Sequence, residues 1–312
     1  MPVAAPLIGI DSAPIPAGGA AEWFAGAGGA RLRAALFPVT GTARGSVVLS
    51  PGRTEPIEKY FEVVEDLRAR GFAVLVHDWR GQGLSHRLLP DRSPGHADGS
   101  ADFMADYRNL IAAFGDRLPK PWIAVGHSMG GCLTLLALAR GETRFSAAIL
   151  SSPMLGLQIG PIPLPFARAT AALAKPFGRA GREAIKSSAE PVAFDANILT
   201  HDRARYERNE AQVVACPDLA LGAPTWGWLD FAFSATRELQ TGRGVANISL
   251  PLTVLAAGEE RLVDNAASRR VTARVADARF VEVPGAYHEL LQETDDLRAV
   301  FWREFDALVA RL

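Results

Sequence analysis

Residues 122–131 read Trp-Ile-Ala-Val-Gly-His-Ser-Met-Gly-Gly, and this stretch decides the fold. An apolar run typical of a buried strand passes directly into a serine flanked by glycines, and the helical pattern of residues 132–140 follows. Glycines on both sides of the serine allow the backbones of strand and helix to approach closely at a sharp turn. A serine at such a corner has an exposed hydroxyl near the positive end of a helix dipole, so Ser128 is the candidate nucleophile.

Strands and helices alternate along the chain on either side of this corner. Apolar runs at residues 45–50 and 72–77 are typical of buried strands, and the apolar spacing of residues 57–70 predicts an amphipathic helix between them. Similar patterns predict strands at residues 147–150, 252–255 and 279–283, and helices at residues 106–118, 225–239 and 295–312. This alternation implies right-handed crossovers, so we predict an α/β fold with a mostly parallel central sheet and helices on both faces.

The alternation is interrupted in the middle of the chain. Residues 156–247 show little strand pattern and carry proline-rich turns and helical pieces. We interpret residues 156–247 as a helical cap inserted between two parts of one core, residues 1–155 and 248–312. The alternative interpretation is a set of ordinary helices packed on the core.

Composition excludes some classes of partner. The chain has 312 residues and a formal net charge of −1. Nucleic acids and anionic membranes attract basic proteins, so no nucleic-acid partner is expected. Cys132 and Cys216 are too few for a disulfide framework, and the sequence shows no metal-ligand spacing.

The sequence also favours one cellular location. The first twenty residues lack the basic segment and continuous apolar run of a signal peptide, and no stretch reaches 18 uninterrupted apolar residues. We therefore expect no transmembrane segment, and the two cysteines, which make no disulfide framework, favour a cytoplasmic protein. Peripheral contact with a membrane through an apolar cap is compatible with this expectation.

A nucleophilic serine needs a histidine base in reach. His288 follows the predicted strand at residues 279–283, and the ends of parallel strands meet at one edge of a sheet, so we expect it to reach Ser128. His127 lies inside the corner and is interpreted as a packing residue beside the site. The remaining histidines are interpreted as strand-end, loop or surface residues: His77, His86, His96 and His201.

The base in turn needs a carboxylate to orient it. Glu259, Glu260 and Asp264 all follow the predicted strand at residues 252–255. Asp264 also has the right position to cap a helix that begins near Asn265. The residues alone leave the identity of the acid open between these side chains.

Acyl transfer also needs N–H donors for the oxyanion that develops in the transition state. One is expected from the backbone of Met129, which follows the nucleophile. The second is expected from the backbone of Arg53, because Gly52 beside it permits close approach. An ordinary exposed turn is the alternative interpretation of residues 50–55.

Five stretches together resemble the monoacylglycerol lipase and bacterial lysophospholipase branch of the α/β-hydrolases. The resemblance covers most of the chain, and in the oxyanion loop Pro51 replaces a family histidine and Thr54 a family glycine. Gly81 and Gly83 match the glycines of the family's Asp-x-x-Gly-x-Gly-x-Ser turn. The matching stretches are residues 51–55, 59–60, 78–85, 126–131 and 285–288.

The resemblance implies specific roles for several residues. The family has an aspartate before Arg-Leu or Arg-Val, and Glu260 occupies that place here, which favours it as the acid while Asp264 stays in contention. Trp226 and Trp228 would line an acyl or alcohol pocket, although aromatic residues at helical spacing are also typical of a plain core.

The implied activity is hydrolysis of carboxylic esters through an acyl-enzyme, without a metal or organic cofactor. Lysophospholipids, monoacylglycerols or similar single-chain lipid esters are the expected substrates. Alternatives on the same scaffold are an acyltransferase, a peptidase or a C–C hydrolase. A non-catalytic ligand-binding protein of the same fold is a further alternative.

Overall fold

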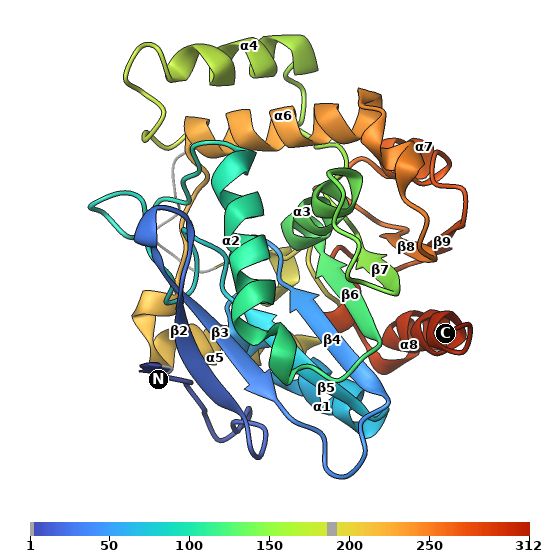
Figure 1. Cartoon of the computed structure of the whole chain (residues 1–312). Helices are drawn as coiled ribbons and strands as arrows, with labels where there is room; N and C mark the ends of the chain where they lie inside the picture. The colour runs from blue at the N-terminus through green and yellow to red at the C-terminus, as the bar shows by residue number, and fades with distance from the viewer. Residues whose placement is uncertain (1–2, 186–191) are drawn as a thin grey trace.

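A computed structural model describes residues 3–185 and 192–312, and within these ranges nine strands form one sheet (Figure 1). Their order is β1-β2-β3-β5-β4-β6-β7-β8-β9. The pairs from β1 to β5 are antiparallel, and those from β5 through β4 to β9 are parallel. The strands are β1 Val3–Ala5, β2 Ala20–Ala25, β3 Arg31–Phe37, β4 Gly45–Ser50, β5 Phe72–His77, β6 Trp122–His127, β7 Ala147–Ser151, β8 Leu252–Ala257 and β9 Ala278–Val283.

Helices cover both faces of the sheet. They are α1 Phe61–Ala69, α2 Ser100–Phe114, α3 Ser128–Ala139, α4 Leu164–Ala174, α5 Arg203–Ala215, α6 Trp226–Thr241, α7 Asn265–Thr272 and α8 Asp295–Val309. Short 3₁₀ turns occupy Ala27–Gly29, Ile57–Tyr60, Gly115–Arg117, Phe194–Ala196, Pro217–Leu219, Gly244–Asn247 and Leu290–Gln292.

The central strands are apolar throughout because they are buried on both faces. In β4, Val48 points into the core beneath α2, α3, α6 and α7, whereas Val47 and Leu49 point into the core beneath α1 and α8. The α/β architecture with a mostly parallel sheet is therefore confirmed, with strands at residues 45–50 and 72–77 as predicted.

Two parts of the fold differ from the sequence prediction. The antiparallel strands β1, β2 and β3 were not predicted. β1 is short, β2 is only partly buried and rich in alanine, and the charged Arg33 interrupts the apolar run of β3. The helix expected at residues 106–118 instead begins at Ser100 and turns into a 3₁₀ segment at Gly115. Phe103 and Met104 in its first turns are buried, so tertiary packing extends the helix toward its N-terminus.

Between β7 and β8, the described part of the chain carries α4, α5 and α6 (Figure 1). α6 lies above α2 and α3, and α4 packs on its outer side (Figure 1). Isolated bridges pair Leu157 with Val263 and Gly95 with Pro224, so this segment is fastened to loops of the core. The boundaries of a separate cap at residues 156 and 247 stay a prediction. No helix among the described residues is both long and apolar enough to cross a membrane.

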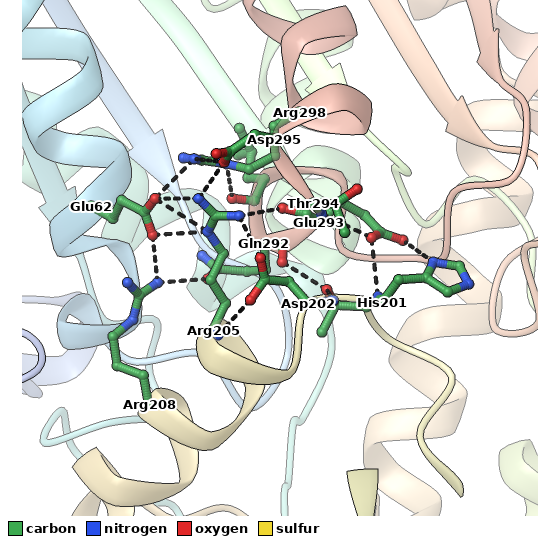
Figure 2. Close-up of polar contacts among 12 residues, drawn as sticks. Glu62, His201, Asp202, Arg205, Arg208, Gln292, Glu293, Thr294, Asp295 and Arg298 are labelled. Atoms are coloured by element: carbon green, nitrogen blue, oxygen red, sulfur yellow. Dashed lines mark hydrogen bonds and ion pairs between the residues drawn. The ribbon is translucent and has the colours of Figure 1, made fainter. Parts of the chain in front are cut away.

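A polar cluster ties α5 to the core (Figure 2). Glu62 of α1 accepts from Arg205 of α5 at 2.6 Å and from Arg298 of α8 at 2.9 Å, and it pairs with Arg208 at 2.7 Å. Arg205 also donates to Asp295 at 2.7 Å. Burial alone would raise the pKa of Glu62, but the three guanidinium groups lower it to about 2.

A second part of the same cluster holds the loop that follows β9 (Figure 2). The buried carboxylate of Glu293 accepts from the backbone N–H of His201 at 3.0 Å, of Tyr287 at 2.7 Å and of Thr294 at 3.1 Å. The His201 ring contacts the same carboxylate at 2.8 Å and stacks on Tyr287. The residue before His288 is therefore fixed by a side chain from its own loop and by a residue that precedes α5.

Glu62→Gln should lower the free energy of unfolding at pH 7 and make it less sensitive to acid. In the native protein the Glu62 pKa lies near 2, below its ordinary value, so its contribution is complete above about pH 4.5 and is lost as pH falls toward 2. We expect a difference on the order of 2 kcal/mol in urea unfolding at pH 7 that shrinks at pH 3. Glu65→Gln on the same helix removes an exposed pair and should change stability by less than about 1 kcal/mol. Equal effects of the two substitutions would contradict this account.

Candidate active site

The turn that carries Ser128 is strained and tightly packed. Ser128 has a positive φ of 49°, which side-chain-bearing residues rarely adopt. A Cβ on Gly126 would lie 2.8 Å from the Gly131 Cα, and one on Gly130 would collide with the carbonyl oxygens of Ser50 and Pro51. Glycine is therefore required on both sides of Ser128 for α3 to start directly where β6 ends.

Three side chains form a continuous hydrogen-bonded chain at the carboxyl edge of the sheet. The Ser128 hydroxyl lies 3.0 Å from His288 Nε2, and His288 Nδ1 lies 2.7 Å from Glu260 Oε2. An ionised carboxylate only accepts hydrogen bonds, so Nδ1 carries the proton and Nε2 is free to accept from Ser128. The three residues predicted from separate loops after β6, β8 and β9 are thus in contact.

The Glu260 carboxylate is held in its ionised form. Its Oε1 accepts from the backbone N–H groups of Arg261 at 3.0 Å, Leu262 at 2.8 Å and Val263 at 3.3 Å. Burial would raise its pKa, but the hydrogen bond and charge of His288, together with these N–H groups, lower the pKa below its ordinary value.

Asp264, the alternative acid, binds the start of a helix instead of His288. Its carboxylate accepts from the backbone N–H of Ala267 at 3.1 Å and caps the N-terminus of α7. Glu260 is the member of this loop that contacts His288. The geometry therefore favours Glu260.

The loop after β4 lies against the nucleophile turn and is held by Gln82, a residue that the sequence analysis did not single out. Gln82 accepts from the Thr54 N–H at 2.9 Å and donates to the Gly52 carbonyl at 3.0 Å. The backbone N–H of Arg53 has no acceptor within the described ranges of the chain. The N–H of Met129 is in the first turn of α3, where no intrahelical acceptor exists. Both predicted oxyanion donors therefore remain available.

A buried ion cluster lies behind this loop. Lys59 Nζ is 3.0 Å from Glu55 and 2.6 Å from Glu289, the residue after His288. Glu55 also accepts from the Tyr60 hydroxyl and the Gly52 N–H, both at 2.5 Å. Burial would raise the pKa of Glu55, but chiefly the charge of Lys59 lowers it to about 2. Glu289 was not predicted as a site residue from the sequence, although its position next to His288 could have indicated it.

The other histidines near the site play structural parts. His127 packs 4.9 Å from His288 between ring centroids, and burial lowers its pKa to about 4, so it is neutral. His96, interpreted as a surface or loop residue, lies in a loop but is buried, with Nδ1 2.8 Å from the hydroxyl of Thr225, which caps α6. Within residues 3–185 and 192–312, no three His, Cys, Asp or Glu side chains converge as metal ligands.

A cavity of about 510 Å³ opens beside Ser128 and His288. Trp226 and Trp228, predicted to line a pocket, both contribute to its wall. Arg53 also lines it. Most of the remaining wall is apolar, with side chains from the segment between β7 and β8 that include Leu157, Ile159, Ile162, Phe166, Leu229 and Phe233.

The sheet order, the strained serine turn and the Ser–His–Glu contacts at the strand ends define an α/β-hydrolase. A family model described as "Serine aminopeptidase, S33" (Hydrolase_4) matches residues 41–295, and the chain belongs to this family.

Two curated relatives are similar over most of their length. Lysophospholipase L2 of Escherichia coli strain K12 is 37% identical over 268 residues, which cover 81% of this chain and 77% of the relative. Monoacylglycerol lipase of Mycolicibacterium smegmatis is 30% identical over 280 residues, which cover 87% of this chain and 91% of the relative. Among solved structures, a soluble variant of monoglyceride lipase from Saccharomyces cerevisiae has a TM-score of 0.71 at 20% identity, covering 91% and 92% of the two chains.

Gly130→Ala should destabilise the protein and disturb the nucleophile turn. The added methyl group would collide with two backbone carbonyl groups that belong to the β4 loop and cannot rotate away. We expect a loss of about 2–4 kcal/mol in unfolding free energy, measured by urea denaturation.

Gly181→Ala is the matched control, because its methyl group would meet only the flexible end of Leu89 at 3.2 Å. A Gly130→Ala protein as stable as this control would disprove the proposed packing constraint.

Proposed function

We propose that the protein is a serine ester hydrolase that cleaves single-chain lipid esters, lysophospholipids or monoacylglycerols, through an acyl-enzyme. The observation that carries the proposal is the Ser128–His288–Glu260 hydrogen-bonded chain at the wall of a largely apolar cavity. The names of both curated relatives support this substrate class. An apolar wall of this kind suits an acyl chain better than a peptide, which disfavours the peptidase alternative.

The first half of the reaction transfers the acyl group to the enzyme. Ser128 Oγ attacks the ester carbonyl carbon while His288 Nε2 takes the hydroxyl proton. The backbone N–H groups of Met129 and Arg53 stabilise the tetrahedral oxyanion. The ester C–O bond then breaks, and the proton on Nε2 passes to the leaving alcohol oxygen.

The second half releases the fatty acid. Water gives a proton to His288 Nε2 and attacks the acyl carbon, and the bond to Ser128 breaks as its oxygen recovers the proton. In both halves the Glu260 carboxylate keeps the proton of Nδ1 in place and stabilises the imidazolium. An acceptor alcohol in place of water would give acyl transfer by the same route.

Ser128→Ala tests the nucleophile directly. The substitution removes the only atom of this residue that can bond to an acyl group, so labelling by a fluorophosphonate probe should be lost. Hydrolysis of a monoacylglycerol or p-nitrophenyl ester should fall by about 10⁴- to 10⁶-fold. Equal labelling of the variant and the unmodified protein would refute the proposed nucleophile.

Glu260→Gln and Asp264→Ala test the choice of acid. The neutral amide that the first substitution introduces cannot hold the proton on His288 Nδ1 as a carboxylate does, so kcat should fall by about 10³- to 10⁴-fold. Asp264→Ala should instead cost about 1 kcal/mol of stability through the lost cap of α7, with kcat for folded protein little changed. Ester hydrolysis and urea unfolding measured on both variants check this, and the reverse pattern would assign the acid to Asp264.

A further inference from the structure

Arg53 carries a charge that no carboxylate among residues 3–185 and 192–312 neutralises. Its Nη2 donates to the carbonyl oxygen of Gly222, but its buried Nε has no hydrogen-bond partner. No carboxylate of the described chain pairs with this guanidinium, and burial alone lowers its pKa to about 10, so it stays charged at neutral pH. Arg33, which is fully buried, shows the contrast, because Glu58 and Asp78 both bind it at 2.7 Å.

The acidic groups in the same cavity are already satisfied. Glu55 and Glu289 also line the wall, but both bind Lys59, and Glu55 accepts further bonds from Gly52 and Tyr60. Among the described residues, Arg53 is therefore the cation of the cavity wall that pairs with no carboxylate. A largely desolvated cation without a counter-ion is costly, and an anion from outside the chain can supply the missing partner.

The guanidinium is also fixed in place. It lies over the ring of Trp228, 5.3 Å from the ring centroid. On another side Gly95 packs against it, where a Cβ would lie 2.7 Å from Nη2. A guanidinium held in this way has a fixed orientation, so it is preorganised to bind an oxyanion through the part that faces the cavity.

The position of the Arg53 side chain relative to the reacting ester carbonyl also suits a phosphate group. The backbone N–H of Arg53 is the proposed second oxyanion donor, so its side chain projects from the residue that contacts the ester. In a lysophospholipid the phosphate is attached to the same glycerol as the ester, a few bonds away. One residue can therefore contact the reacting carbonyl through its backbone and the phosphate through its side chain.

We propose that the Arg53 guanidinium binds the phosphate of a lysophospholipid and makes phosphate-bearing single-chain esters the preferred substrates over neutral monoacylglycerols. This inference rests on the proposed function. The acyl chain occupies the apolar part of the cavity, near Phe166 and Phe233, and the phosphate takes the place of the missing counter-ion at Arg53 in the wall of the same cavity.

The test compares two substrates with the same acyl chain, 1-octanoyl-lysophosphatidylglycerol and 1-octanoylglycerol, both below their critical micelle concentrations. Arg53→Gln keeps the backbone N–H and removes the charge. We expect kcat/KM for the phosphate substrate to fall by about 10- to 100-fold, mainly through a higher KM. The neutral substrate reports any disturbance of the oxyanion loop and should fall much less.

Arg269→Gln is the matched control, because Arg269 is exposed, pairs with Glu282 and lies outside the cavity wall. It removes one positive charge from the molecule and should leave the ratio of the two kcat/KM values unchanged. A similar loss of ratio in Arg269→Gln would show that overall charge, not the site, sets the preference, and the proposal would be wrong.

Other outcomes also decide the matter. An equal fall for both substrates in Arg53→Gln, or no preference for the phosphate substrate in the unmodified protein, overturns the proposal while leaving ester hydrolysis intact. Inorganic phosphate that inhibits neutral-ester hydrolysis at submillimolar concentration, and only when Arg53 is present, assigns the site to free phosphate and overturns it too. Absence of both fluorophosphonate labelling and ester hydrolysis in the unmodified protein would refute the proposed function itself.

Discussion

The close approach of Gly130 to the carbonyl groups of Ser50 and Pro51 is the contact on which the site depends. It places the end of β4 directly against the start of α3, so the loop after β4 and the first N–H groups of the helix face the same point. The strained backbone of Ser128 persists because this packing and the parallel strands on both sides leave no room for relaxation. The positions of the nucleophile and of the proposed oxyanion donors therefore depend on the same backbone contact.

Much of the fold could be predicted from sequence because the central strands are buried on both faces. Apolar runs of this kind stand out, and the predicted strands at residues 45–50 and 72–77 have the observed bounds. The strands at residues 20–25 and 31–37 were missed, since the first is only partly buried and rich in alanine, and the charged Arg33 interrupts the apolar run of the second. The predicted start of α2 was wrong, because the packing of Phe103 against distant residues extends the helix. No local sequence pattern records such packing.

The candidate site was predictable where chain order limits the choice and less so where several residues share a loop. Ser128 and His288 each have a distinctive place after a strand. Glu260 and Asp264 lie four residues apart, and only the folded loop shows which carboxylate turns toward the histidine and which caps a helix. The lack of a counter-ion for Arg53 within the described chain could not be inferred from sequence, because it depends on which side chains of distant elements come near it.

The buried ammonium of Lys59 has a consequence for how such a site can change over time. It bonds at once to the loop that follows β4 and to the loop that carries His288, so these two loops are bound to a common charge. Replacing either loop with one from another protein would leave a buried charge without its partner. Few new contacts could offset the resulting loss of stability. The two loops are therefore expected to be inherited and grafted together, whereas the apolar wall between β7 and β8 is free to diversify.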